Sequence, residues 1–153
     1  MSCTIRPALE DDAEAISEVI LRALRETNAK HYSREIIARV ERSFSPTAVL
    51  QLISRRKVFV ATLGSRVVGT ASLEGSVVRT VFVTPDAQAR GLGKRLMAEI
   101  ERTAREGHIP LLTVPSSITA EPFYARLGFK AVRDSYHGDE RTIIMERSLD
   151  EPS

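Results

Sequence analysis

The stretch VVRTVFVTPDAQARGLGKRL, residues 77–96, decides the predicted fold. Val77–Val83 is rich in β-branched residues and predicts a strand. Pro85 and Asp86 then turn the chain, which passes through Gly91-Leu92-Gly93 directly into a helix. Glycine at a helix start costs conformational entropy, so its presence needs a physical reason. The reason we favour is close approach of an anion to the backbone.

A helix start suits an anion because its first N–H groups have no intrahelical partners and the helix dipole adds about half a positive charge. Gly91 and Gly93 carry no side chain that would block these groups, and Arg90, Lys94 and Arg95 add positive charge. The pattern predicts a pyrophosphate site, although its spacing fits neither a Walker loop nor the three-glycine dinucleotide motif. On this stretch alone, a tight turn that lets helix pack on strand explains the glycines equally well.

The sequence on either side predicts an α+β chain. The pairs Gly64-Ser65 and Gly75-Ser76 mark hairpin turns between three antiparallel strands, whereas a strand–helix–strand segment requires a parallel crossover. We therefore expect a central mixed, mostly antiparallel sheet flanked by helices. Strands are expected at Cys3–Leu9, Val58–Leu63, Arg66–Leu73, Val77–Val83, Ile109–Val114, Phe129–Arg133 and Arg141–Arg147, and helices after caps at Asp11 or Asp12, Ser33 and Ser45, at Gly91–Glu106 and at Thr119–Leu127.

Composition limits the classes of function. The 153 residues predict one domain over 1–153, and 22 Lys and Arg against 20 Asp and Glu give a net charge of +2, too small to indicate a nucleic-acid or membrane partner. Cys3 is the only cysteine, which excludes an internal disulfide and a multi-cysteine metal site. No ligand cluster for a metal is evident, and we expect a reduced, cytoplasmic setting.

Two motifs together resemble the GNAT superfamily of N-acetyltransferases. The family pattern is Gln/Arg-x-x-Gly-x-Gly/Ala after a strand ending in an aromatic or aliphatic residue and Val-x-Pro, followed one strand later by Phe-Tyr-x-x-x-Gly-Phe. Here these are Phe82-Val83-Thr84-Pro85, then Gln88-Ala89-Arg90-Gly91-Leu92-Gly93, and later Phe123-Tyr124-Ala125-Arg126-Leu127-Gly128-Phe129. The resemblance covers Cys3 to Arg147 and implies transfer of an acetyl group from acetyl-CoA to an amine.

The resemblance also implies where acetyl-CoA binds. In the family the motif strand splays from its parallel neighbour and pantetheine lies in the gap, so the backbone of Val81 and Val83 should pair with it, while Phe82 faces the other side and packs. Ser117 stands where many members have an Asn that contacts pantetheine. Arg90 and Lys94 could reach outer phosphates or be solvated cations. The N–H groups expected to hold the pyrophosphate are those of Gln88, Ala89, Arg90, Gly91, Leu92, Gly93 and Lys94.

Tyr124 matches the family's general acid. Attack by the amine releases CoA as a thiolate, whose conjugate acid has a pKa of about 8.5, and a nearby phenol can protonate it as the bond breaks. A core aromatic beside Phe123 is the alternative for Tyr124. Many members carry a basic Glu early on the motif strand, where this chain has Val77. Glu74 acting through water, or His31 in the break between the first helices, could replace it, and either could instead be a surface charge.

The acceptor is not determined by sequence. The segments expected to form its pocket, Thr27–Ser54 and Tyr136–Asp139, carry no diagnostic pattern, and a small-molecule primary amine is expected only from the breadth of the superfamily. A homodimer is left open. The competing hypothesis is a GNAT-like module that binds acyl-CoA as a sensor without catalysing transfer, which the missing strand Glu favours and Tyr124 opposes.

Overall fold

The computed structural model describes residues 3–28, 34–87, 90–137 and 140–149. They form a seven-stranded sheet in the order β1-β2-β3-β4-β5-β7-β6. The strands are β1 (Cys3–Pro7), β2 (Lys57–Leu63), β3 (Arg66–Glu74), β4 (Val77–Val83), β5 (Leu111–Ser116), β6 (Lys130–His137) and β7 (Glu140–Ser148). The helices are α1 (Ala13–Asn28), α2 (Arg34–Ser43), α3 (Pro46–Arg55), α4 (Leu92–Glu106) and α5 (Glu121–Arg126), with short 3-10 turns at Glu10–Asp12 and Pro85–Ala87.

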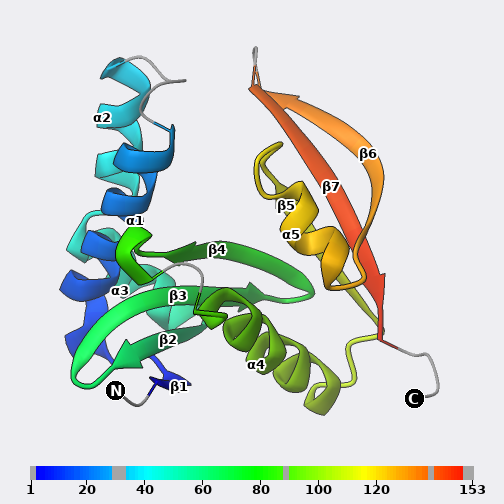
Figure 1. Ribbon diagram of the computed structural model, residues 1–153, viewed down its shortest axis with the longest axis horizontal. Helices are drawn as coiled ribbons and strands as arrows, with labels where there is room; N and C mark the ends of the chain where they lie inside the picture. The colour runs from blue at the N-terminus through cyan, green and yellow to red at the C-terminus, as the bar shows by residue number, and fades with distance from the viewer. Residues whose placement is uncertain (1–2, 29–33, 88–89, 138–139, 150–153) are drawn as a thin grey trace.

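The sheet separates into two parts between β4 and β5 (Figure 1). Every other neighbouring pair is antiparallel, whereas β4 and β5 are parallel and register at the single pair Val77 and Thr113. A hydrogen bond of 3.0 Å from the Thr113 N–H to the Ser76 carbonyl closes the same end. Beyond it the two strands diverge, and α4 provides the crossover between them (Figure 1).

A β-bulge bends β4 at this divergence. Thr70 of β3 registers with Phe82, and Ser72 registers with Arg79, so β4 carries one more residue than β3 across the same interval. Thr80, inside the bulge, has a φ of 57°, which is rare for a β-branched residue. A bulge increases the local twist and redirects side chains, so the backbone itself turns β4 away from β5.

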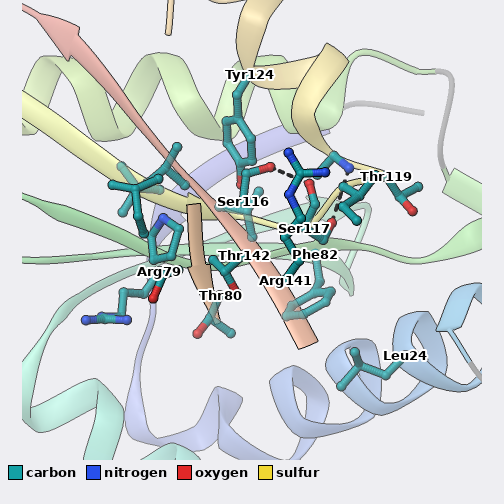
Figure 2. A pocket seen from close by; sticks show the side chains of 18 of the residues that line it. Leu24, Arg79, Thr80, Phe82, Ser116, Ser117, Thr119, Tyr124, Arg141 and Thr142 are labelled. Atoms are coloured by element: carbon teal, nitrogen blue, oxygen red, sulfur yellow. Dashed lines mark hydrogen bonds between the residues drawn. The ribbon is translucent and has the colours of Figure 1, made fainter. Parts of the chain in front are cut away.

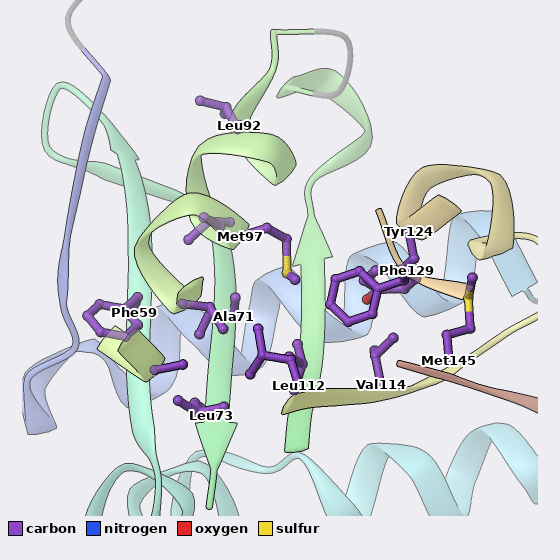
Figure 3. Packing of buried hydrophobic residues seen from close by; sticks show 14 of the residues in the cluster. Phe59, Ala71, Leu73, Leu92, Met97, Leu112, Val114, Tyr124, Phe129 and Met145 are labelled. Carbon is purple, nitrogen blue, oxygen red and sulfur yellow. The ribbon is translucent and has the colours of Figure 1, made fainter. Parts of the chain in front are cut away.

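Helices cover both faces of the sheet. The buried side of α4 follows the helical period, with Leu92, Leu96, Ile100 and Ala104 packed on one face together with sheet residues such as Ala71 and Leu112 (Figure 3). On the other face α1 and α3 bury Ile16, Ile20 and Val49 against Val60 of β2. Burial of apolar side chains on both faces fixes β4 in the sheet, so the site at its diverging edge rests on a rigid support.

The predicted α+β class and mixed, mostly antiparallel sheet are confirmed, with element ends shifted by a few residues. The cap at Ser45 is also confirmed, because its hydroxyl accepts the Ala48 N–H at 3.2 Å. The cap at Asp11 or Asp12 is wrong in its detail. A 3-10 turn precedes α1, and the Asp12 carboxylate instead accepts the Leu9 N–H at 2.7 Å and pairs with Arg6 at 2.8 and 3.0 Å. This pair lowers the pKa of Asp12 and ties β1 to the start of α1.

Candidate active site

A cleft of about 960 Å³ opens where β4 and β5 diverge. Its walls come from β4, β5 and the segment leading into α5, with Leu24 of α1 and parts of β6 and β7 closing the remaining sides (Figure 2). The volume lies within the range of ligand pockets in proteins. None of the described residues that line it is acidic or a histidine.

The end of β4 supplies the first group of expected cofactor residues. Val81 and Phe82 both line the cleft. Val81 and Val83 pack against the core cluster under α4, whereas Phe82 packs against the cluster under α1 and α3. Their side chains therefore alternate as the sequence predicted, and the strand edge faces the gap left by β5.

The start of α4 supplies the second group. Gly91 is the N-cap, with a left-handed φ of 72° and no side chain to cap the helix, and the Arg95 N–H is bonded to its carbonyl at 3.1 Å. By helix geometry the N–H groups of Leu92, Gly93 and Lys94 have no intrahelical acceptor. The Arg90 and Lys94 side chains are exposed beside them, whereas the Leu92 side chain is buried in the core. Gln88 and Ala89, also expected here, lie outside the described residues.

The two glycines of this turn differ in function. A Cβ atom on Gly91 would meet nothing within 4 Å, so its glycine character is set by the left-handed backbone and leaves open space in front of the helix. A Cβ on Gly93 would lie 3.2 Å from two ring carbons of Phe123. Gly93 therefore allows α4 to pack closely on α5, and the structural explanation left open by the sequence applies to it.

Tyr124 reaches the cleft from α5 (Figure 2). Tyr124 as a whole is only 6% exposed, and its ring makes edge contacts with Phe123 and Phe129 at centroid distances of 5.1 and 5.7 Å. Its hydroxyl makes no hydrogen bond with any described residue. Burial raises the pKa of Tyr124, so the phenol stays protonated at neutral pH and can act as a donor.

Ser117 lines the cleft beside Tyr124. Its hydroxyl accepts the Ala120 N–H at 3.1 Å, and its carbonyl accepts the Ser116 hydroxyl at 2.7 Å (Figure 2). The first of these bonds stabilises the turn into α5 and fixes the position of the following tyrosine. Ser117 is thus at the site, with its hydroxyl oxygen already engaged as an acceptor.

Of the two expected bases, only Glu74 lies among the described residues, and it is not in the cleft. Glu74 ends β3, does not line the cleft, and forms ion pairs with Arg79 at 3.3 Å and with Arg56 at 3.8 Å. His31 lies outside the described residues. No sequence pattern predicted the arginines among the described lining residues, which are Arg56, Arg79 and Arg141.

The parted sheet, with a buried tyrosine at the opening and a glycine-started helix after β4, defines an acetyltransferase architecture. Residues 28–145 match the family model described as an acetyltransferase (GNAT) domain, and the chain belongs to the GNAT family of acetyltransferases. It is 29% identical over 129 residues to YafP of Escherichia coli strain K12, named an uncharacterized N-acetyltransferase, across 84% of this chain and 82% of that one.

Solved structures agree on the fold. A GCN5-related N-acetyltransferase from Rhodopseudomonas palustris superposes with a TM-score of 0.87 at 26% identity, covering 97% of each chain. The PaiA N-acetyltransferase from Thermoplasma acidophilum, solved in complex with coenzyme A, superposes with a TM-score of 0.85 at 23% identity, covering 97% of this chain and 100% of that one. Among the described residues, no helix is long and apolar enough to span a membrane.

Proposed function

We propose that residues 1–153 form one acetyltransferase domain that transfers the acetyl group of acetyl-CoA directly to a primary amine of a small molecule. The observation that carries this proposal is Tyr124, a buried phenol that lines the cleft between β4 and β5 and makes no hydrogen bond with a described residue. Coenzyme A in the similarly folded Thermoplasma protein supports acetyl-CoA as the donor.

Acetyl-CoA would lie along the diverging edge of β4. The backbone of Val81 and Val83 pairs with the pantetheine amides in this proposal, as an added strand would. Its pyrophosphate binds the N–H groups from Gln88 to Lys94 at the start of α4, where the helix dipole and the exposed Arg90 and Lys94 favour an anion. The thioester is thereby directed into the cleft that Tyr124 lines.

The reaction is a direct displacement. The neutral amine attacks the thioester carbonyl, a C–N bond forms, the C–S bond breaks, and the Tyr124 hydroxyl gives its proton to the departing thiolate. The phenolate regains a proton when the new amide loses its own. Burial raises the pKa of Tyr124, so the phenol keeps its proton until the thiolate forms beside it.

The base that deprotonates the amine is the open part of this proposal. Glu74 can act only through intervening water, because it does not line the cleft and is shared by two arginines. His31 is the second candidate, placed by the resemblance in the segment that covers the acceptor.

The absence of acidic and histidine side chains among the described lining residues favours the competing function, a sensor that binds acetyl-CoA without turnover. The acetyltransferase and sensor functions are distinguished by measuring release of the CoA thiol from acetyl-CoA in the presence of a panel of primary amines. We expect thiol release that depends on the amine and matches the acetylated product mole for mole. Tight binding of acetyl-CoA with no amine-dependent release across the panel would support the sensor.

A further inference from the structure

Among the described residues, three arginines line the cleft, and they differ in how their charges are neutralised. Arg79 and Arg141 are each 43% exposed, and each pairs with a carboxylate, Glu74 at 3.3 Å and Asp134 at 3.2 Å. Arg56, just after α3, is only 13% exposed. A charged group buried this far is costly unless it is well paired, so the partners of Arg56 decide whether it is structural.

The Arg56 guanidinium is incompletely bonded within the protein. Its Nη1 donates to the Thr80 hydroxyl at 3.1 Å and to the Ser72 hydroxyl at 3.5 Å. Its Nε is buried and makes no hydrogen bond with a described residue, because the nearest carboxylate oxygen, of Glu74, is 3.8 Å away. A guanidinium has five N–H donors, and because Nε is buried, the donors left for a ligand in the cleft are those of Nη2, for which no bond to a described residue is found.

The local charge is also unbalanced. Arg56 and Arg79 bring two positive charges and Glu74 brings one negative charge, which leaves one positive charge in this group. Desolvation lowers the pKa of Arg56; the charge of Glu74 opposes this, while those of Arg79 and the exposed Arg55 add to it, and the arginine stays charged at neutral pH. A bound monoanion would neutralise the group.

Thr80 adds a second contact for such an anion. Its hydroxyl oxygen accepts from Arg56, and its own O–H is not donated to any described residue. The β-bulge and the φ of 57° set the direction of this side chain, and strained residues of this kind concentrate at binding sites. Thr80 and Leu24 lie at one side of the cleft while Tyr124 enters from the other (Figure 2).

We propose that the acceptor is an amine that also carries a carboxylate, and that Arg56 and Thr80 bind this carboxylate while the amine faces the thioester near Tyr124. A planar carboxylate matches the fork of an arginine, and a single negative charge matches the single excess positive charge. This assignment rests on the proposed acetyl transfer and names the substrate class for it.

The wild-type test compares amino acids with their carboxamides as acceptors. Glycine, β-alanine and 4-aminobutyrate are paired with glycinamide, β-alaninamide and 4-aminobutyramide, and kcat/KM is taken from thiol release. We expect at least one free acid to exceed its carboxamide by about 10- to 100-fold, the range for hydrogen bonds to a charged group. The carboxamide amine is the less basic of each pair, so a preference for the acid cannot arise from a larger fraction of free amine.

The variant test uses Arg56→Met with Arg55→Met as a matched control. Arg55 is the exposed neighbour outside the cleft, so its loss changes the net charge equally. Arg56→Met should raise KM for the preferred acid by about 10-fold or more, with a smaller effect on its carboxamide, since a ground-state contact is removed. Arg56→Lys should restore part of the preference, and Arg55→Met should keep all of it.

Wild-type inhibition keeps the proposal testable if Arg56→Met does not fold. Butyrate, which has no amine, should inhibit competitively against the preferred acceptor, and butyramide should not. Equal kcat/KM for acids and carboxamides, or equal inhibition by butyrate and butyramide, would overturn the carboxylate assignment and leave acetyl transfer standing. Turnover of other primary amines but of none of these acids would overturn the carboxylate assignment alone, whereas bound acetyl-CoA with no turnover of any acid, carboxamide or other primary amine would overturn acetyl transfer and the assignment with it.

Discussion

The proposed donor side and the proposed acceptor side of the cleft are built differently. The donor side comes from one continuous segment, β4 through the start of α4, and uses backbone groups on a strand edge and at a helix end. The proposed acceptor side combines Thr80 of β4 with Leu24, Arg56 and Arg141 from other parts of the chain, and it would use their side chains. Backbone recognition requires glycines at fixed spacing and leaves a local sequence motif. Side-chain recognition from remote positions leaves none.

Tyr124, where the two sides meet, carries the largest expected effect. Tyr124→Phe should lower kcat by at least about 10-fold, within the 10²–10⁴-fold range of general acid–base catalysis, because it removes the proton donor to the thiolate. Steady-state kinetics with an identified acceptor measures this.

The affinity of Tyr124→Phe for CoA distinguishes a catalytic role of the hydroxyl from a role in binding. We expect the variant to bind CoA nearly as tightly as wild type. Wild-type turnover would make Tyr124 a packing residue, with water protonating the sulfur. Loss of CoA binding together with activity would make its hydroxyl a ground-state contact and would favour the sensor.

Gly91 tests the donor side alone, with a smaller effect. Gly91→Asn places a side chain beside the helix-start N–H groups, while Asn tolerates the left-handed backbone. We expect CoA affinity to fall about 10-fold, or about 1.4 kcal/mol. Gly64→Asn is the matched control, because Gly64 has a φ of 62° and equally open space in a hairpin turn far from α4 in sequence.

Calorimetric titration with CoA measures the Kd of both asparagine variants, and thermal unfolding measures their stability. The two should lose similar stability, since the backbone change is the same, and only Gly91→Asn should lose affinity. Equal CoA affinity in Gly91→Asn and Gly64→Asn would mean that the turn before α4 is structural.

The sequence predicted what local chemistry controls. Alternating β-branched residues, hairpin glycines and the Ser45 cap specify elements within a few residues, and the sheet followed from them. Asp12 was misassigned because Arg6 competes for its carboxylate, a contact between segments that periodicity does not encode. Gly93 was grouped with Gly91 because only packing against Phe123 distinguishes the two.

The candidate site was predictable on one side only. Val81, Phe82, Ser117 and Tyr124, which the motifs singled out, all line the cleft, and their roles there stay predictions. Arg56 could not be found from sequence, because its significance depends on burial, on the bulge at Thr80 and on a carboxylate shared with Arg79. These are properties of the folded arrangement rather than of any short pattern.

The central claim is that the diverging edge of β4 and the start of α4 bind acetyl-CoA. The most direct test is the shift in Tm when acetyl-CoA is added. A ligand that binds only the folded state raises the free energy of unfolding by about 2.7 kcal/mol when its concentration is 100 times Kd. For a chain of this size, each 1 kcal/mol of stabilisation raises Tm by about 2–4 °C. For a Kd of about 10 μM, ~1 mM acetyl-CoA is about 100 times Kd, and we predict that Tm rises by several degrees at this concentration. An unchanged Tm at millimolar acetyl-CoA and CoA would contradict the donor site and the function proposed from it.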